Sequence, residues 1–455
     1  MGLYSISLIV AGCILFVFFG GFVVVSIKEN ETRATKIACL FMLFAVVLGI
    51  SGIWFPIEVK KWLAIGEYVI VFISIIGFFL PVGKVEIKND VPNIRFDERD
   101  IMFSRALLKQ GTWQYTSYYK MRPENKHSDD VTRSKPGLLA KGSTYYNQPH
   151  YAIPEASFRV TDALQPVVEG EPNEEKYEPL NPEQATSFVI SLTKYFGALE
   201  AGVTELKPYH VYSHVGRGSG TYGESITLNH DYAIAFTVEM DYAMIAANPA
   251  PPGVLESAKQ YVEAARVAVQ VAETLRAMGY NARAHIDGNY RVIAPLVARD
   301  AGLGEIGRIG LLITPKYGPR VRIGVITTDM PLVASQRKPD LSVIDFCNVC
   351  KKCAYNCPVR SIPLDDRKEV DGAYRWRINP DTCYRYWTVV GTDCGRCMTV
   401  CPYSHPNNIM HNLVRWGTKK SGAFRRFAVL MDDLLYGKQP EQRELVHWFN
   451  LEKEQ

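Results

Sequence analysis

The sequence predicts a chain of α/β class, with membrane-spanning helices at the N-terminal side of the α/β part and a small cysteine-rich module after it. Nearly all of the strongest apolar runs precede residue 81, and eight of the ten cysteines lie between residues 347 and 401. Between them, apolar strand patterns alternate with helical patterns. A chain of 455 residues is too long for one small domain. The net charge of +4 indicates no preference for nucleic acid, so we expect no nucleic-acid partner.

Three N-terminal stretches are long and apolar enough to cross a bilayer. Residues 3–26 and 37–55 carry no charge, and residues 62–80 carry only Glu67. At about 1.5 Å per residue, each stretch can span a hydrocarbon layer of about 30 Å. Buried core helices are the alternative, but aromatic residues stand at the expected interfaces and prolines close two of the runs. We therefore predict a three-helix anchor over residues 1–81 and a multi-pass protein of the inner (cytoplasmic) membrane.

The basic residues that flank these stretches predict the orientation of the chain. An N-terminus outside the cytoplasm places seven of nine flanking cations inside, namely Lys28, Arg33, Lys36, Lys84, Lys88, Arg95 and Arg99, and leaves Lys60 and Lys61 outside. We therefore expect the catalytic part to face the cytoplasm. Glu67 has two open interpretations, because its carboxylate either reaches back to the interface or serves a quinone or a proton.

The region that follows divides into a polar part and an α/β part. Residues 82–180 are polar, and we expect a loop-rich covering region without an assigned function. Residues 181–335 predict an α/β sandwich domain. Its expected elements are a helical stretch at 183–202, strands at 211–216, 232–240, 281–285 and 320–330, and a long helix at 254–278 that begins after Gly253 and stops at Gly279.

The cysteines of residues 336–406 have the spacing of a ferredoxin with two clusters. Cys347, Cys350, Cys353 and Cys357-Pro358 form the bacterial C-x2-C-x2-C-x3-C-P run, whose fourth cysteine binds the other cluster. A second run ends in Cys401-Pro402. We therefore predict two [4Fe–4S] clusters with crossed ligation, one held by Cys347, Cys350, Cys353 and Cys401, the other by Cys383, Cys394, Cys397 and Cys357.

Zinc and disulfides are the alternative uses of these cysteines. Eight thiols in two runs that each end in Cys-Pro favour iron–sulfur clusters over zinc, and the pattern suits a reduced interior better than disulfides. Cys13 and Cys39 lie in the apolar stretches and are interpreted as small apolar residues. Two clusters transfer single electrons, whereas residues 182–335 are too many for a ferredoxin alone. What the clusters feed is therefore expected in that region.

Over roughly residues 180–440 the sequence resembles the reductive dehalogenases, which are corrinoid and iron–sulfur enzymes that remove halide from organohalides. The resemblance rests on an ordered set of motifs: YSHVGRG at 212–218, DYAIAFTVEMDY after His230, LRAMGYNA at 275–282, the long stretch at 288–332, both cysteine runs and the late MDDLLYG. It implies a nitroreductase-like corrinoid-binding sandwich at 181–335, joined to the ferredoxin-like two-cluster module, with residues 407–455 as a C-terminal covering segment.

The resemblance also implies where the corrinoid binds. Gly302, Gly304 and Gly307 form a GxGxxG pattern, but the acidic residue that a dinucleotide site needs about 20 positions later is missing. We interpret this pattern as a tight backbone bend against the corrinoid, with further contacts from Tyr212 and His214. The resemblance implies a base-off corrinoid, and His214 is consistently outside any D-x-H-x-x-G motif, although a lower-face histidine is an alternative use of it. A core or strand-end role for His214 stays open as well.

The implied acid is a tyrosine beside a cation, with an asparagine in the same pocket. By their place among the motifs these are Tyr261, Arg322 and Asn289. A guanidinium within about 4 to 6 Å stabilises a phenolate, so the phenol gives up its proton more easily. Two alternatives stay open: helical periodicity also accepts Tyr261 as a core aromatic, and Arg320 competes with Arg322.

The implied reaction is R–X + 2e⁻ + H⁺ → R–H + X⁻, with an organohalide as substrate. The fused helices suggest that electrons come from a membrane quinol, although a ferredoxin-type donor could serve instead, and a homodimer is possible. Two other functions compete: reduction of epoxyqueuosine in tRNA by a similar corrinoid and iron–sulfur enzyme, and non-catalytic electron transfer by a membrane ferredoxin. The helices and the near-neutral charge speak against the first, and residues 182–335 speak against the second.

Overall fold

The structure is a computed structural model that describes residues 2–83, 85–86, 88–177, 181–440 and 442–449. The chain forms two compact units. One comprises Met1–Glu86, Leu341–Cys350 and Pro406–Pro440, and the other Ile87–Asp340, Lys351–His405 and Glu441–Gln455. Parts of the predicted segments lie outside the described residues, namely Lys84 and residues 178–180 and 450–455. The predicted five-domain division stays a prediction.

The first unit contains the three predicted apolar helices. Their lengths and mean hydropathies suffice to cross a membrane, and each extends beyond the apolar run that predicted it. Glu67 accepts a hydrogen bond from Ser7 Oγ at 2.7 Å, which ties the third helix to the first. The helices of this unit are α1 (Leu3–Lys28), α2 (Thr32–Trp54), α3 (Ile57–Phe79), α12 (Leu341–Cys350), α16 (Ile409–Lys420) and α17 (Gly422–Tyr436).

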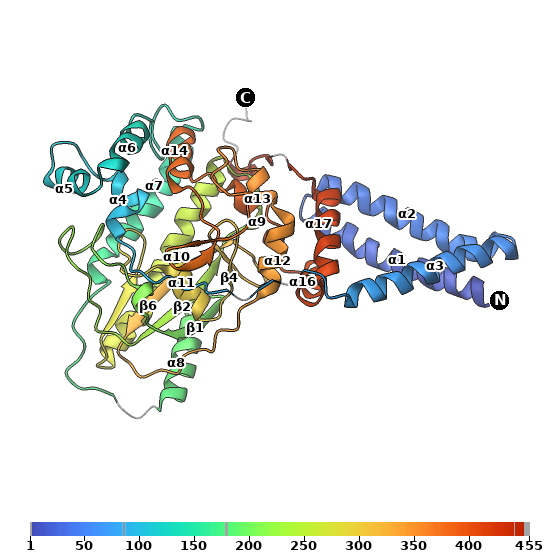
Figure 1. Ribbon diagram of the computed structural model, residues 1–455, viewed down its shortest axis with the longest axis horizontal. Coiled ribbons are helices and arrows are strands. Elements are labelled where there is room, and N and C mark those ends of the chain that lie inside the picture. The colour runs from blue at the N-terminus through green and yellow to red at the C-terminus, as the bar shows by residue number, and fades with distance from the viewer. Residues whose placement is uncertain (1, 84, 87, 178–180, 441, 450–455) are drawn as a thin grey trace. The chain divides into compact units, whose positions relative to one another are not determined.

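The second unit is built on a four-stranded antiparallel sheet of order β1-β2-β6-β3 (Figure 1). Three of the strands lie where the sequence predicts them, at 232–240, 281–285 and 320–330. Successive side chains of a strand point to opposite faces of the sheet, and apolar side chains cover both faces here. Val238 is paired with Arg322 in the register of the two central strands. The strands are β1 (Glu200–Glu205), β2 (Tyr232–Glu239), β3 (Ala282–His285) and β6 (Val321–Thr328).

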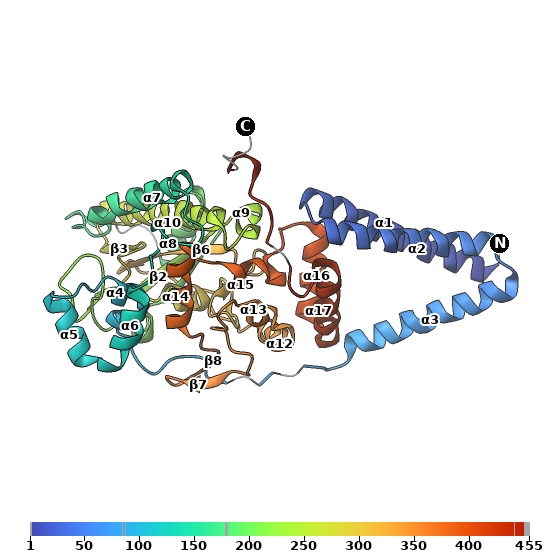
Figure 2. The ribbon, with the colours of Figure 1, turned by 90° about the horizontal axis from the view of Figure 1, so that it is seen from above.

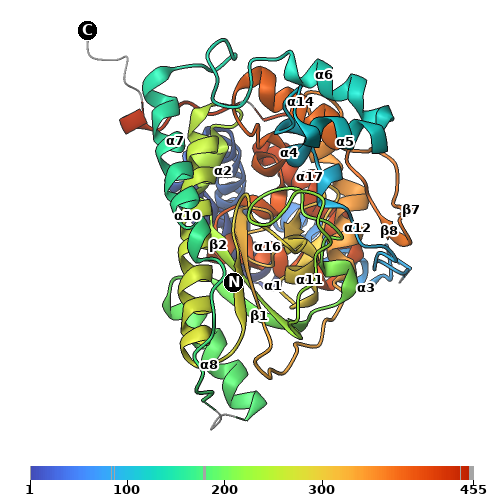
Figure 3. The ribbon, with the colours of Figure 1, turned by 90° about the vertical axis from the view of Figure 1, so that its left-hand side faces the viewer.

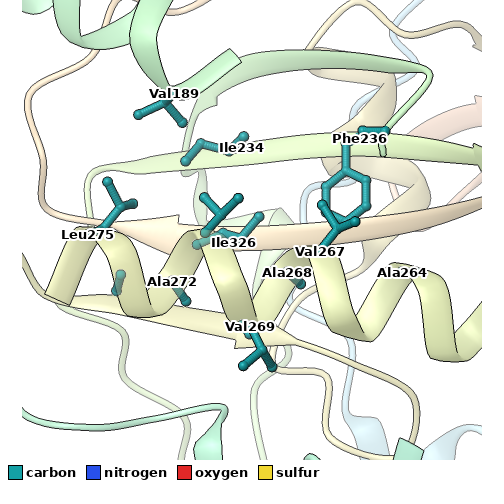
Figure 4. Close-up of a cluster of buried hydrophobic side chains, with 14 of the residues drawn as sticks. Val189, Ile234, Phe236, Ala264, Val267, Ala268, Val269, Ala272, Leu275 and Ile326 are labelled. Atoms are coloured by element: carbon teal, nitrogen blue, oxygen red, sulfur yellow. The ribbon is translucent and has the colours of Figure 1, made fainter. Parts of the chain in front are cut away.

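Helices cover both faces of this sheet. On one face α10 (Pro251–Ala277) runs along the strands, with α8 (Pro182–Tyr195) beside it (Figure 3). Small and branched side chains recur on α10 at helical spacing and pack against Ile326 and Phe236 (Figure 4). On the other face α11 (Ala294–Asp300) packs against β2 and β6. The unit is thus an α/β sandwich, and the description as nitroreductase-like stays a prediction.

Helix α10 begins earlier than predicted. The sequence reading started it after Gly253, but Pro251 and Pro252 occupy its first two positions. A proline fits there because the first amides of a helix have no intrahelical acceptor and its fixed φ is already helical. Gly279, with φ of 82°, follows the C-terminal end, where the left-handed conformation favours glycine.

The expectation of a loop-rich region at 82–180 is wrong for much of that segment. It contains α4 (Met102–Ala106), α5 (Trp113–Met121), α6 (Lys126–Arg133) and α7 (Gln148–Ala163). Helix α7 runs along α10 (Figure 2). The polar residues that suggested loops lie on the outer faces of amphipathic surface helices. Each of these helices packs against the unit with its other face.

Two further expectations about the strands fail. Residues 211–216 form isolated bridges, Val211 to Val292 and His214 to Ser225, rather than a strand. The helical pattern at 183–202 stops at Tyr195, and its end forms β1. Gly197 has a φ of 114°, so the backbone there leaves the helical region.

The remaining short elements connect the sheet to the cysteine-rich part. Near the sheet lie α9 (Tyr242–Ala246), β4 (Glu305–Ile306) and β5 (Leu312–Ile313). The cysteine-rich part contains α13 (Lys352–Tyr355), β7 (Lys368–Val370), β8 (Ala373–Arg375), α14 (Pro380–Val390) and α15 (Arg396–Thr399). The 3-10 turns are Glu98–Asp100, Pro123–Asn125, Gln165–Val167, Pro208–His210, Pro402–Ser404 and His447–Phe449.

Candidate functional site

Tyr261 of α10 and Arg322 of β6 are in direct contact. Cζ of Arg322 lies 4.5 Å from the centroid of the Tyr261 ring. Arg322 keeps 21% of its side chain accessible although β6 is a central strand. Arg322 is the second residue of β6, so it lies near the end of the sheet. The structure therefore brings the two predicted residues together there.

Burial decides the charge state of Tyr261. It raises the pKa of the phenol, the guanidinium of Arg322 offsets this only partly, and Asp287 and Asp393 raise the pKa further. The sequence argument weighed only the arginine, which would lower the pKa. In the structure the phenol therefore holds its proton at neutral pH, as a general acid must before the reaction.

Asp393 fixes the guanidinium of Arg322. Its Oδ2 accepts a hydrogen bond from Arg322 Nη2 at 3.3 Å and another from the hydroxyl of Ser257. Ser257 stands one helical turn before Tyr261 on α10. Asp393 also directly precedes Cys394 in the chain. One carboxylate therefore links the helix of the tyrosine, the strand of the arginine and the cysteine-rich loop.

Three further residues gather around this pair. Burial raises the pKa of Tyr290 well above its usual value, with Tyr261 and Asp287 adding to the rise. Burial also raises the pKa of the Asp287 carboxyl, while Arg217 and Arg322 lower it. Sequence reasoning missed Asp287, Tyr290 and Arg217, although the first two flank Gly288 and Asn289 in the motif that drew attention to Asn289.

Asn289 lies in the same turn but in a different hydrogen-bond group. Its Oδ1 accepts from Arg283 Nη2 at 2.7 Å and from Ser219 Oγ at 3.2 Å. Arg283 also donates to Glu169. Asn289 is fully buried, and its Nδ2 has no hydrogen-bond partner among the described residues. Asn289 itself is therefore not in the Tyr261 group, but the next residue in the chain, Tyr290, is.

Arg320, the competing cation, has a different role. It is fully buried, and it donates to the carbonyl of Ser404 at 2.9 Å and to Glu239 at 2.8 Å. These bonds join β6 to β2 and to the chain after the last cysteine. Of the two arginines, Arg322 is therefore the one that contacts Tyr261.

The three glycines of the GxGxxG pattern do not form a nucleotide-binding turn. Gly302, with φ of 82°, ends α11, whereas a dinucleotide site requires such a pattern to begin a helix. A Cβ at Gly304 would strike the carbonyl of Ile313 on β5, and Gly307 donates to the carbonyl of Leu311 at 3.0 Å. The bend was predicted correctly, and the contact of these glycines with a corrinoid stays a prediction.

Tyr212 and His214 lie outside the Tyr261 group. Burial raises the pKa of Tyr212 to about 12, with Glu98 adding to the rise. The side chain of His214 is 38% exposed, and its Nδ1 lies 3.0 Å from Ser213 Oγ and 3.4 Å from Asp97. Their predicted contacts with a cofactor stay predictions.

Four cysteines of the second unit lie close together. Burial raises the pKa of Cys383 to about 11, with Cys357 adding to the rise. Burial also raises the pKa of Cys394 to about 12, with further contributions from Cys383 and Cys357. Burial also raises the pKa of Cys397 well above its usual value, and Cys394, Cys353, Cys383 and Cys357 add to the rise. The amide of Ser361 donates to Cys357 Sγ at 3.2 Å. Thiols gathered in this way fit a cationic metal cluster, which stabilises thiolates.

The other four predicted ligands are distributed along the chain as their spacing requires. Cys347 and Cys350 lie on α12, and Cys350 is its last residue. Cys353 lies on α13, and Cys401 precedes the turn Pro402–Ser404. Lys351, the residue between the two helices, has a positive φ of 53°, so the helical backbone is interrupted there. The predicted ligation by these four residues stays a prediction from spacing.

Comparisons with known proteins match parts of this chain. A family model described as a 4Fe-4S dicluster domain matches residues 346–405. A tetrachloroethene reductive dehalogenase of Desulfitobacterium hafniense is 34% identical over 197 residues, which are 41% of this chain and 35% of that protein. Its counterpart from Sulfurospirillum multivorans is 37% identical over 172 residues, 36% of this chain and 34% of that protein. The matched part thus spans about a third of these relatives.

A weaker relative and a solved structure complete the comparison. An epoxyqueuosine reductase of Listeria monocytogenes is 32% identical over 123 residues, 24% of this chain and 28% of that protein. The solved catabolic reductive dehalogenase NpRdhA has a TM-score of 0.64 at 24% identity, over 78% of this chain and 48% of that chain, which shows a common fold. The chain is thus similar to curated reductive dehalogenases over 36–41% of its length and shares its fold with a solved one.

Proposed function

We propose that this protein is a membrane-bound reductive dehalogenase that replaces the halogen of an organohalide with hydrogen. The observation that carries the proposal is the Tyr261–Arg322 pair, held by Asp393 next to Cys394. A proton donor and an electron-transfer ligand then lie in the same group of residues. A ferredoxin that only relays electrons has no use for a buried phenol beside a guanidinium, so the pair favours an enzyme.

A corrinoid is the cofactor that this proposal requires. A solved reductive dehalogenase is described in terms of B12-dependent dehalogenation. Aromatic and polar side chains gather beside Arg322, which suits a broad ring with amide substituents. Tyr261, Tyr290, Arg322 and Arg217 would border the ring, with Gly302, Gly304, Gly307, Tyr212 and His214 as the further predicted contacts. When bound, the corrinoid supplies the two-electron reductive cleavage of the carbon–halogen bond.

Two [4Fe–4S] clusters are proposed to supply electrons one at a time. The gathering of Cys357 with Cys383, Cys394 and Cys397 supports crossed ligation, because Cys357 belongs to the other run in the sequence. The immediate electron donor is either a membrane quinol or a ferredoxin-type protein. The apolar helices favour the quinol, since they place the chain in the layer where quinols reside.

Each residue of the site has a distinct role in the proposed reaction. Tyr261 donates the proton that replaces the halide. Arg322 stabilises the phenolate that remains, and Asp393 keeps Arg322 over the ring. Asn289, fixed by Arg283 and Ser219, is proposed to orient the substrate. A homodimer and an inner-membrane location with the catalytic part in the cytoplasm complete the proposal.

Metal analysis and a substrate panel test this function. We expect the full chain, purified without oxygen, to contain about one Co and about eight Fe. With a reduced viologen as electron donor it should release halide from at least one compound of a panel of chlorinated and brominated alkenes and phenols. Iron without cobalt would identify an electron carrier, and cobalt without halide release from any compound would contradict dehalogenation.

Reduction of epoxyqueuosine in tRNA is the second candidate. It is favoured by the 32% identity to the Listeria monocytogenes enzyme, although that match covers only 24% of this chain. The same preparation, given an epoxyqueuosine-containing stem loop, should leave it unchanged. Formation of queuosine would replace the first proposal with this one.

A further inference from the structure

Helices α16 and α17 carry their apolar side chains on the outside. On α16, Ile409 is 80% exposed, and Leu413 and Trp416 follow at intervals of four and three residues. On α17, Leu430 is 68% exposed, with Phe427 three residues before it and Leu434 four residues after it. This spacing places each group of three on one helix face. Each face is therefore an apolar surface that is exposed among the described residues.

The buried side of α17 combines paired charges with apolar contacts. Arg425 Nε donates to Asp345 of α12 at 2.5 Å, and its Nη1 donates to the carbonyl of Thr418 at 2.8 Å. Leu435 is buried in a cluster with Phe22 and Ala38 of the apolar helices. An amphipathic helix in water exposes polar side chains. The exposed residues of α17 are apolar instead, and its buried charges are paired, which fits surroundings that are less polar than water.

The apolar faces continue the surface of the long N-terminal helices. Trp416 stacks on Phe78 in the last turns of α3, with ring centroids 6.0 Å apart. Arg33, in the first turn of α2, donates to the carbonyl of Leu434 at 2.9 Å. His411 contacts Phe22 near the end of α1. Helices α16 and α17 therefore pack at one end of the three apolar helices (Figure 2), where a spanning bundle meets the membrane surface.

The composition of the two helices is that of a segment at the membrane interface. Trp416 and Phe427 are aromatic residues of the kind that gather at headgroup level. Lys419 and Lys420, both exposed, occupy the last turn of α16. Interfacial helices combine such apolar faces with basic residues that attract anionic lipid headgroups.

We propose that α16 and α17 lie in the lipid–water interface, with their exposed apolar side chains among the upper acyl chains. Lys419 and Lys420 then contact anionic headgroups. Water is the poorer solvent for this surface, because six large apolar side chains in two adjacent helices would remain exposed in it. The inference uses the membrane location but does not depend on the dehalogenase activity.

Photo-crosslinking in a bilayer tests this position. The full chain is reconstituted in vesicles of phosphatidylcholine with phosphatidylglycerol, with benzoylphenylalanine at position 413 or 430. Ile73 of α3 is the positive control, since it is exposed on an apolar helix, and Tyr195 of α8 is the exposed control outside the first unit. We expect lipid adducts by mass spectrometry at positions 413, 430 and 73, and none at position 195.

Each other outcome contradicts a distinct statement. Adducts with lipid at position 73 but not at 413 or 430 overturn the interfacial position and leave the spanning helices intact. Adducts of 413 or 430 with a second copy of the chain mean that the surface is a protein interface. Absence of lipid at position 73 overturns the membrane location itself.

A second measurement uses Trp416 as a depth probe. In vesicles with brominated acyl chains, Trp416→Phe should remove a measurable part of the tryptophan quenching that the wild-type protein shows. Trp376→Phe, which replaces a buried tryptophan of the second unit, is the matched control and should leave the quenched part unchanged. Equal quenching of wild type and Trp416→Phe would contradict the position of α16.

Discussion

Arg322 lies over the ring of Tyr261 and donates at the same time to Asp393, the residue before Cys394. The guanidinium thus stands between a phenol that stays protonated and a loop that is predicted to hold an iron–sulfur cluster. A proton and an electron are the two things that the proposed reaction consumes. The contact therefore connects the routes by which both would reach the substrate.

Replacing Tyr261 by Phe tests the proton donor. This change keeps the ring under Arg322 and removes only the hydroxyl, so cobalt and iron contents should stay at wild-type levels. Turnover should fall by about 10²- to 10⁴-fold, as is typical for loss of a general acid. Tyr195→Phe, at an exposed position, is the matched control. Wild-type turnover of Tyr261→Phe with full cofactor content would identify Tyr261 as a core aromatic.

Replacing Arg322 by Met should also lower turnover. Arg322 is the largest influence that lowers the pKa of Tyr261, so without it the phenol holds its proton more tightly. In a double variant with Tyr261→Phe the two losses should be less than additive, because the residues act on one proton. Arg266→Met removes a half-exposed arginine of the same helix as Tyr261 and should leave turnover unchanged. Fully additive losses would mean that Arg322 acts elsewhere.

Cys401→Ala and Cys357→Ala form a reciprocal pair that tests crossed ligation. If Cys401 completes the cluster of Cys347, Cys350 and Cys353, its loss should damage that cluster and leave the signal of the other in electron paramagnetic resonance. Cys357→Ala should damage the cluster of Cys383, Cys394 and Cys397 instead. Loss of the same signal in both variants, or iron that stays near about eight per chain in either, would contradict the assignment.

Acid should destabilise the fold through His285. Burial, followed by the charge of Arg283, lowers the pKa of His285 well below its usual value. Its Nδ1 accepts from the amide of Arg291 at 3.1 Å, and its Nε2 lies 2.9 Å from Thr327 Oγ1, which suits the neutral ring. The unfolded chain binds a proton here below about pH 6.5, and the folded chain does not, so stability should fall by up to about 1.4 kcal/mol per pH unit.

The melting temperature of the full chain in detergent measures this loss. The decrease from about pH 7.5 to about pH 5.5 should be smaller in His285→Asn than in wild type. His127→Asn, at an exposed position of α6, should keep the wild-type decrease. Equal decreases in all three proteins would mean that His285 does not couple folding to pH.

Protease added to right-side-out spheroplasts tests the orientation. The basic residues around the apolar helices predict a cytoplasmic catalytic part, so it should survive until the cells are lysed. A membrane protein with a known periplasmic domain, digested before lysis, serves as the control. Digestion of the catalytic part before lysis would reverse the orientation, and release by carbonate wash would contradict the spanning helices.

The sequence by itself determined the features that depend on local pattern. Long apolar runs predicted α1, α2 and α3, apolar alternation predicted β2, β3 and β6, and cysteine spacing predicted the dicluster module that the family model matches. Each helix, strand and cysteine run here depends on residues close together in the sequence, where composition and periodicity are sufficient.

Only the tertiary structure decided which residues meet across elements. Arg320 and Arg322 are equivalent by spacing, and only the packing of β6 against α10 gives Arg322 the contact with Tyr261. Burial, which no motif reveals, reversed the expected direction of the pKa shift of Tyr261. The segments at 82–180 and 211–216 were misjudged because surface helices and isolated bridges are stabilised by partners far away in the sequence. The exposed apolar face of α17 also became recognisable only in the tertiary structure, because helical periodicity gives the same pattern whichever face is buried.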